Sequence, residues 1–226
     1  MDSTFFNAES IRGFTSIFVA ICSATSYPFG FPSRSNRPPL EILKFLVATL
    51  SNQDTKVAFI REDEDGSLAR SSEFMNTCHN MNIIVHTTGV DAYSLNGESE
   101  SPNKTLANIN RTLILKSIHK KEPWCFAYQY SIWLSRRTDN ILCSDFLYLL
   151  WHGKRPSYKH IKIWGVRVFI INGRATLKKL DDRSYRGNLL GYATTTGVVL
   201  YWKSYQPFLF TESIIFGLIN IILASL

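Results

Sequence analysis

Two carboxylates stand at positions where an α/β chain commonly displays its chemistry. Asp63 follows the apolar run KVAFIR at residues 56–61, and Glu100 lies in the polar stretch SLNGESESPNKTL at residues 94–106. The first run has the character of a strand, and the second leads into a stretch with helical spacing, so the two acids come from separate elements. Mg²⁺ accepts carboxylate oxygens while it keeps some of its waters. The pair therefore predicts a magnesium site that needs a third ligand.

The elements that must position these acids alternate between strands and helices. Ser71 or Ser72 is expected to cap one helix, and Leu106, Ile109 and Leu113 line one face of another that begins at Glu100. The order of the elements predicts a mixed α/β domain. Strands are predicted at 13–22, 27–31, 56–61 and 83–87, and helices at 40–52, 71–82, 100–113 and 124–137, the last of these amphipathic and aromatic.

The last third of the chain differs from the rest in its sequence pattern. The stretch HGKRPSYKHIKIWG at 152–165 is basic and broken by proline, and the apolar runs at 166–171, 187–192 and 197–202 predict a small β module. The tail at 214–226 is apolar but shorter than the roughly 20 residues of a spanning helix. We expect a buried or frayed helix there, with a tail anchor as the alternative, and no secretory signal at the other end.

Composition limits the classes of protein to which the chain can belong. Its 226 residues are 45% hydrophobic and 19% charged, which favours a folded chain with one main core and a small appendage. The net charge of +7 predicts a polyanionic partner, with nucleic acid as the first choice. Cys22, Cys78, Cys125 and Cys143 show no CxxC spacing, so buried reduced thiols are expected rather than a zinc site.

Four separated motifs resemble the integrase of copia-type LTR retrotransposons. FIREDEDGSLARSSEF at 59–74 resembles the family's strand followed by Arg-x-Asp, a glycine and a helix that begins in Glu-Phe. LNGESE at 95–100 resembles its Asn-Gly-x-x-Glu motif. WHGKRPSYKHIKIWGVRVFI at 151–170 and KKLDDRSYRGNLLGYATTTGVVLYW at 178–202 resemble two later blocks. The resemblance runs from residue 2 to about residue 207, and four motifs in order are far more specific than one.

The resemblance implies a catalytic triad of Asp2, Asp63 and Glu100. Sixty residues lie between the first two acids and 36 between the last two, as in the DDE pattern of the family. The same three side chains would be the metal ligands, holding two Mg²⁺ or Mn²⁺ ions. Asp65 could take the place of Asp63, and Glu98 is expected to be solvated.

The fold that the resemblance implies is an RNase H-like α/β domain. It would contain a mixed five-stranded sheet with flanking helices, followed by the small β-rich module. The expected divisions are a catalytic core at 1–152, a basic linker and β module at 153–206, and an apolar tail at 207–226.

The implied reaction is metal-dependent DNA strand transfer, in which a DNA 3′-hydroxyl attacks a target phosphodiester. The partners would be the cDNA ends of the element and target DNA, with a homo-oligomer as the active form and neither a small-molecule substrate nor a membrane. The protein would be made in the cytoplasm and act in the nucleus or in a retrotransposon particle. Phosphate contacts are expected from Lys104, Arg111, Lys154, Arg155, Lys159 and Lys162, with ordinary solubilising charge as the alternative for each.

Two other functions stay open at this point. In the family a His/His/Cys/Cys zinc domain precedes the core, and these residues contain no such spacing, while Asp2 stands one residue from the start of the sequence. A ligand at a frayed terminus is held loosely, so a catalytically inert remnant that binds nucleic acid is one alternative. An RNase H-like nuclease that nicks DNA without joining it is the other.

Overall fold

The structure is a computed structural model of the whole chain. It describes residues 2–35, 40–63, 71–88, 93–117, 122–140, 145–158, 161–171, 178–181, 184–192 and 199–203.

The N-terminal third of the chain forms an antiparallel sheet of three strands. These are β1 (Asp2–Phe5), β2 (Ser16–Ile21) and β3 (Pro28–Ser33), in the order β1-β2-β3. In the β2–β3 hairpin, Ser16 lies opposite Ser33, and the pairing continues to the turn without a break. The hairpin expected from the apolar runs at 13–22 and 27–31 is therefore confirmed.

The central strand β2 is buried on both faces. Ile17 and Val19 belong to one buried cluster, whereas Phe18 and Ala20 belong to another. Successive side chains of a strand point to opposite faces of its sheet, so a continuous apolar run suits a strand that is covered on both sides. The predicted helix at 40–52 is α1 (Leu40–Ser51), and it packs in the second cluster.

A parallel strand pair follows α1. Strands β4 (Phe59–Asp63) and β5 (Ile84–Thr88) pair in parallel, and α2 (Ser72–Asn80) connects them. Ser71 caps this helix, because its side chain accepts a hydrogen bond from the Phe74 N–H at 3.3 Å. These strands and this helix match the expected elements, although β4 begins three residues later than predicted.

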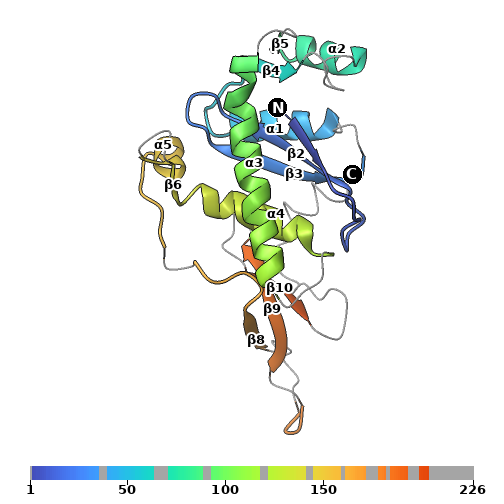
Figure 1. Ribbon diagram of the computed structural model, residues 1–226, viewed down its shortest axis with the longest axis vertical. Helices are drawn as coiled ribbons and strands as arrows, with labels where there is room; N and C mark the ends of the chain where they lie inside the picture. The colour runs from blue at the N-terminus through green and yellow to red at the C-terminus, as the bar shows by residue number, and fades with distance from the viewer. Residues whose placement is uncertain are drawn as a thin grey trace.

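The five expected strands fall into two sheets among the residues that the structure describes. The hydrogen bonds join β1, β2 and β3 into one sheet and β4 with β5 into another. Figure 1 shows β4, β5 and α2 together above the three-stranded sheet. The mixed α/β class is thus present without a continuous five-stranded sheet in this part of the chain. Sequence patterns specify strands more strongly than they specify which strand edges pair, since edge pairing depends on long-range contacts.

The long helix α3 (Tyr93–Lys116) begins earlier than predicted. Glu100 was expected at the helix entrance, and it lies instead in the third turn, two residues before Pro102. The turn preferences of Asn96 and Gly97 gave the wrong boundary, because a long helix that packs on a neighbouring helix can contain such residues. The prediction that a helix carries Glu100 is confirmed.

Helix α4 (Trp124–Ser135) is buried on nearly all sides, with nine of its 12 residues inaccessible. The expectation of an amphipathic helix at 124–137 is therefore wrong. A helix that is apolar or aromatic all round belongs in the interior of a protein. The buried hydroxyl of Ser131 is satisfied within the helix, since it donates to the Tyr128 carbonyl at 2.7 Å.

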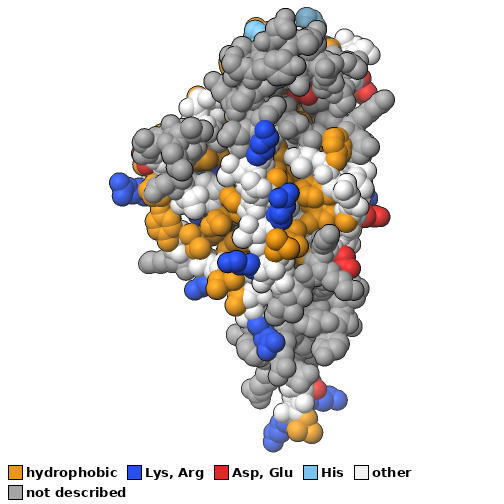
Figure 2. Space-filling view, in the orientation of Figure 1, with side chains coloured by type: hydrophobic (Ala, Val, Ile, Leu, Met, Phe, Trp, Pro, Cys, Tyr) orange, Lys and Arg blue, Asp and Glu red, His pale blue; other side chains and the backbone are white. Residues whose placement is uncertain are grey.

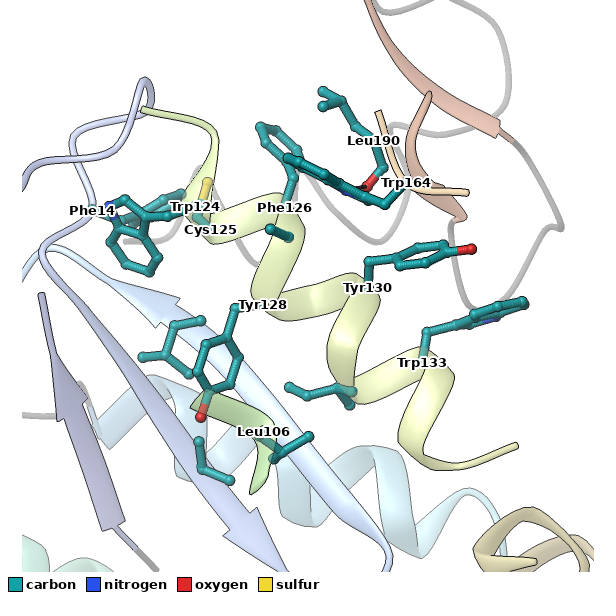
Figure 3. Packing of buried hydrophobic residues seen from close by; sticks show 14 residues of the cluster. Phe14, Leu106, Trp124, Cys125, Phe126, Tyr128, Tyr130, Trp133, Trp164 and Leu190 are labelled. Atoms are coloured by element: carbon teal, nitrogen blue, oxygen red, sulfur yellow. Dashed lines mark hydrogen bonds between the residues drawn. The ribbon is translucent and has the colours of Figure 1, made fainter. Parts of the chain in front are cut away.

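Two groups of elements meet on α4, as Figure 3 shows. On one side, Trp124 and Tyr128 lie toward Phe14 and the three-stranded sheet. On the other side, Trp133 lies toward the C-terminal strands and stacks at a tilt on Tyr192, with ring centroids 4.9 Å apart. The helix is therefore the shared core of both parts of the molecule.

The C-terminal strands form an antiparallel sheet in the order β10-β9-β8. Strands β8 (Arg167–Ile171), β9 (Ser184–Tyr192) and β10 (Val199–Lys203) confirm the small β module expected after residue 152. Leu190 of β9 and Trp164 join the same buried cluster as α4. The predicted domain boundary at 152/153 stays a prediction, and the buried core continues across it.

Three of the four cysteines lie in the described part of the structure. Cys78 and Cys125 are buried and free, as expected, and Cys22 is half-buried. Burial raises the pKa of the Cys125 thiol to about 11, which keeps it protonated.

Cys143 and the apolar tail at 207–226 lie outside the described residues. Across the described part, no helix combines the length and apolar character that a membrane crossing requires.

The contact between β3 and α4 predicts a specific coupling. Gly30 of β3 accepts a hydrogen bond from Gln129 at 2.7 Å, and a Cβ atom on Gly30 would collide with Cδ1 of Ile132. Gly30→Ala is expected to lower the free energy of unfolding by about 1–3 kcal/mol through this overlap. Ile132→Val removes the colliding atom, so the double variant should lose less stability than the two single changes summed.

Urea denaturation of the four proteins in this cycle measures the coupling. Ile42→Val is the matched control, because Ile42 is equally buried but lies on α1 in the other cluster. Its effect should add to that of Gly30→Ala. Additive effects for Ile132→Val as well would contradict the close packing of β3 on α4.

Candidate functional site

The three predicted acids lie on three separate elements. Asp2 pairs with Val19 at the start of β1, Asp63 pairs with Thr88 at the end of β4, and Glu100 lies in α3. Their side chains are outside the described part of the structure, so their mutual distances stay untested. In Figure 1 the chain's N-terminus, β4 and the N-terminal end of α3 occupy the same upper part of the view.

The strand that carries Asp2 is fixed to the start of α4. Phe6 stacks on Trp124 with ring centroids 3.8 Å apart, and the Trp124 indole N–H donates to the Ala8 carbonyl at 2.8 Å. Farther along, the Ile11 N–H donates to the Glu122 carbonyl at 2.9 Å. These contacts anchor the residues immediately after β1, which pairs with β2 along its whole length.

Strand β4 contains a buried acid that the sequence analysis missed. Ile60 and Glu62 are buried, 2% and 6% exposed, whereas Phe59 and Arg61 are exposed. The alternation in EDED was the available signal, because residues two apart in a strand share a face. Glu62 lies beside the predicted ligand Asp63 in the sequence, at the end of this strand.

Lys104 and Arg111 lie on one exposed face of α3. They are seven residues apart and both exposed, while Asn103, Leu106 and Asn110 are buried on the side that packs inward. Figure 2 shows Lys and Arg side chains spaced down the middle of this surface, where α3 runs in Figure 1. The structure therefore confirms the shared face that the spacing predicts.

Lys154 and Arg155 follow a helix that sequence analysis did not predict. Helix α5 (Leu147–His152) ends at Gly153, whose φ of 66° lies in the left-handed region. The Gly153 N–H donates to the Leu149 carbonyl at 2.8 Å and closes the last turn. The chain then turns outward, so that both basic side chains are exposed. Lys159 lies outside the described residues.

The exposed side chain of Lys162 extends from a fixed backbone. The Tyr130 hydroxyl donates to the Lys162 carbonyl at 2.5 Å, and the Trp164 indole N–H donates to the Leu190 carbonyl at 2.9 Å. This segment therefore lies between α4 and β9 with its position determined from both sides.

A pair of arginines at the end of α4 was also missed. Arg136 donates from Nε and Nη2 to the Pro28 carbonyl at 3.0 and 2.6 Å, and its guanidinium lies 4.4 Å from the centroid of the Tyr27 ring. Burial lowers the pKa of Arg136, and Tyr27 partly offsets that effect. Two adjacent arginines after an aromatic run were the signal in the sequence.

His152 lies against the same aromatic group. Its Nε2 is 3.2 Å from the Tyr27 hydroxyl, and its ring centroid is 4.2 Å from that of Tyr148. Burial lowers the pKa of His152 most, and the charges of Arg136, Lys154 and Arg137 lower it further. The charges near His152 are therefore positive, and they disfavour protonation of the imidazole.

No metal-binding group of three His, Cys, Asp or Glu side chains occurs among the described side chains. Asp2, Asp63 and Glu100 are not among those side chains, so the predicted metal site stays a prediction.

Comparison with known proteins adds two relationships to this geometry. No protein-family model matches the chain. Over 138 residues the chain is 28% identical to the Retrovirus-related Pol polyprotein from transposon TNT 1-94 of Nicotiana tabacum. That match covers 61% of this chain and 10% of the polyprotein, so the chain spans about a tenth of that relative.

The fold is similar to a chain in the simian T-cell lymphotropic virus intasome in complex with PP2A regulatory subunit B56 gamma. The TM-score is 0.55 at 14% sequence identity, over 93% of this chain and 78% of that one. The chain therefore resembles part of a retrotransposon Pol polyprotein in sequence and a chain of a viral intasome in fold. This likeness in fold extends beyond β1–β5, because an overlap of 93% of the chain includes part of the C-terminal module.

The surroundings of His152 predict that its pKa is lowered. The pKa of His152 should lie below the ordinary value of 6.5, and Lys154→Ala should raise it by removing a neighbouring positive charge. It should remain below 6.5, because burial is the larger cause. Protein stability that depends on neutral His152 is present above pH 6.5 and is lost as the pH falls through the lowered pKa.

NMR titration of the imidazole resonances measures this pKa, with His152→Gln to assign the signal. Lys44→Ala is the control, since Lys44 is an exposed lysine on α1 that pairs with Glu41. A His152 pKa at or above 6.5 would contradict the described surroundings of the ring.

Proposed function

We propose that the chain is the catalytic core of a copia-type retrotransposon integrase that performs metal-dependent DNA strand transfer. The observation that carries the proposal is the joint similarity to a retrotransposon Pol polyprotein in sequence and to an intasome chain in fold. The two similarities come from different properties of the chain, and both lead to integrase-related function.

The positions of the three acids support the assignment of catalytic roles. Asp2, Asp63 and Glu100 are contributed by a sheet strand, a second strand and a long helix, each held by its own packing. Ligands on strands and helices are held more precisely than ligands on loops. An RNase H-like arrangement of these strands and helices is part of this proposal.

The donor set fits magnesium or manganese. Three carboxylates offer hard oxygen ligands and the negative charge that a pair of divalent cations requires. Asp2, Asp63 and Glu100 would hold the ions, which supply charge neutralisation at the phosphate and lower the pKa of the attacking DNA hydroxyl. The protein's own contribution is to hold the carboxylates and the DNA in fixed positions.

The exposed cations would orient the DNA. Lys104 and Arg111 share one face of α3, the helix that also carries Glu100, so phosphates bound there would lie along the catalytic helix. Lys154, Arg155 and Lys162 would add contacts from the later block, together with Lys159. Phosphate contacts fix the position of DNA without reading its sequence, which suits insertion at many sites.

The partners and location follow from the same proposal. Element cDNA ends and target DNA would be the substrates, and a homo-oligomer of the chain would be the active form. Action would take place in the nucleus or in a retrotransposon particle after synthesis in the cytoplasm.

A strand-transfer assay tests the activity. The full chain is incubated with Mg²⁺ or Mn²⁺, a labelled duplex with a free 3′-hydroxyl end and a supercoiled target, and joined products are separated on gels. Asp63→Asn and Glu100→Gln should each abolish joining, a loss of at least about a hundredfold, because a neutral amide cannot hold the metal charge. Glu98→Gln is the matched control on the same helix and should retain activity.

The other outcomes separate the alternatives. Asp65→Asn distinguishes Asp65 from Asp63 as the second ligand, and only one of the two changes should be inactivating. Metal-dependent nicking without joined product would indicate the nuclease. DNA binding that is unaffected by chelators and by Asp63→Asn, without any joining, would indicate the inert remnant and contradict the proposed activity.

A further inference from the structure

A cluster of cations and aromatic rings at the end of α4 has no role in the triad. It comprises Arg136 and Arg137 after α4, Tyr27 before β3, and Tyr148 and His152 of α5. The contacts form a chain: Arg136 lies over Tyr27, Tyr27 reaches His152, His152 lies against Tyr148, and Tyr148 lies under Arg137. Segments far apart in the sequence thus build one site.

The two arginines of this cluster are in different states. Arg136 is tied down by two hydrogen bonds to the Pro28 carbonyl, so its role is to join α4 to β3. Within the described part of the structure, the side chain of Arg137 makes one hydrogen bond, from Nη1 to the Trp133 carbonyl at 2.9 Å. A guanidinium has five N–H donors, so most of those of Arg137 remain available.

Aromatic rings hold the guanidinium of Arg137 in place. Its Cζ atom lies 4.1 Å from the centroid of the Trp133 ring and 4.9 Å from that of Tyr148. Trp133 is itself buried, at 7% exposure, and fixed in the core. Because the guanidinium is oriented before any ligand arrives, little conformational entropy is lost when it binds a planar or tetrahedral anion.

No carboxylate among the described side chains forms an ion pair with Arg137. Among the described residues the recorded ion pair is that of Lys44 with Glu41 on α1, far along the chain from this cluster. Two acids lie near Arg137 in the sequence. The side chain of Asp139 is outside the described part of the structure, and Asp145 Oδ1 accepts the Phe146 N–H at 2.8 Å. Two positive charges close in sequence without an ion pair favour an external anion.

The cluster continues into exposed cations. Lys154 and Arg155 follow His152 directly after the turn at Gly153, and both are exposed. Figure 2 shows Lys or Arg side chains at the left edge of the surface, where α5 lies in Figure 1, apart from those along α3. An arrangement of several cations suits a chain of phosphates better than a single small anion.

We propose that Arg137, with Lys154 and Arg155, forms a second phosphate-binding site for the backbone of a nucleic acid, separate from the α3 face. Arg137 is the anchor, since its fork can bind a phosphate through two parallel hydrogen bonds. The inference rests on the proposed function for the identity of the polyanion. Its geometry stands independently of the metal site.

Equilibrium binding tests the site without any catalysis. The full chain is titrated against a fluorescein-labelled DNA duplex in EDTA, and anisotropy is followed at several salt concentrations. Arg137→Ala should weaken binding about tenfold at ~0.1 M salt and reduce the slope of log affinity against log salt by about one. Arg137→Lys should fall between the wild type and Arg137→Ala, because it keeps the charge and loses the planar fork.

Controls separate binding from folding. Lys44→Ala changes the net charge equally and should leave the affinity within about twofold of wild type. Thermal melting is recorded for every variant, and Arg137→Gln, which keeps a planar group over the rings, replaces Arg137→Ala if the alanine variant is unfolded. The effects of Arg137→Ala and Lys104→Ala should multiply, as expected for two separate contacts.

Three results would overturn the inference. If Lys104→Ala weakens binding while Arg137→Ala and Arg137→Gln match wild type, the second site is wrong and the proposed function stands. If the wild type binds poly-glutamate but not DNA, the cluster receives an acidic protein segment instead. If the wild type binds neither, both the site and DNA binding by this chain are wrong.

Discussion

The burial of α4 on nearly all of its sides is the constraint on which the rest of the structure depends. A helix with so many aromatic side chains is stable only if other elements cover it completely, and here the three-stranded sheet, α3 and the C-terminal strands supply that cover. Trp124 fixes the segment after β1, and Tyr130 fixes the backbone of Lys162. The element that carries Asp2 and the segment that carries Lys162 therefore have a common anchor.

Fixed backbones also explain how exposed cations become useful. Lys104 and Arg111 project from a helix whose opposite face is packed, and Lys154 follows a helix end closed at Gly153. A long basic side chain loses less entropy on binding when its backbone is already placed. In Arg137 the side chain is held as well as the backbone, because two rings orient the guanidinium. The guanidinium of Arg137 is therefore held in place more firmly than the basic side chains on α3.

Most elements were predictable from local patterns. The β2–β3 hairpin, the Ser71 cap and the C-terminal strands follow from alternation, capping and turn residues, which act over a few residues. The pairing of β4 with β5 alone, and the full burial of α4, depend on contacts between distant segments. The start of α3 at Tyr93 was missed because Asn96, Gly97 and Pro102 signal turns locally.

For the candidate site, the sequence predicted which acids could act but not how they are arranged. Spacing and resemblance selected Asp2, Asp63 and Glu100, and the structure places them on two strands and a helix without testing their roles. Trp133 lies one helical turn before Arg137, but Tyr148 is brought to the arginine only by the tertiary fold, so the full Arg137 cluster could not be predicted.

Crystals of the chain grown with Mn²⁺, measured at the manganese absorption edge, test most directly whether the three carboxylates converge. Anomalous density in contact with Asp2, Asp63 and Glu100, and its loss in crystals of Glu100→Gln, is the expected result. Manganese bound only at other residues, in crystals where all three carboxylates are ordered, would contradict an integrase-type metal site in this fold.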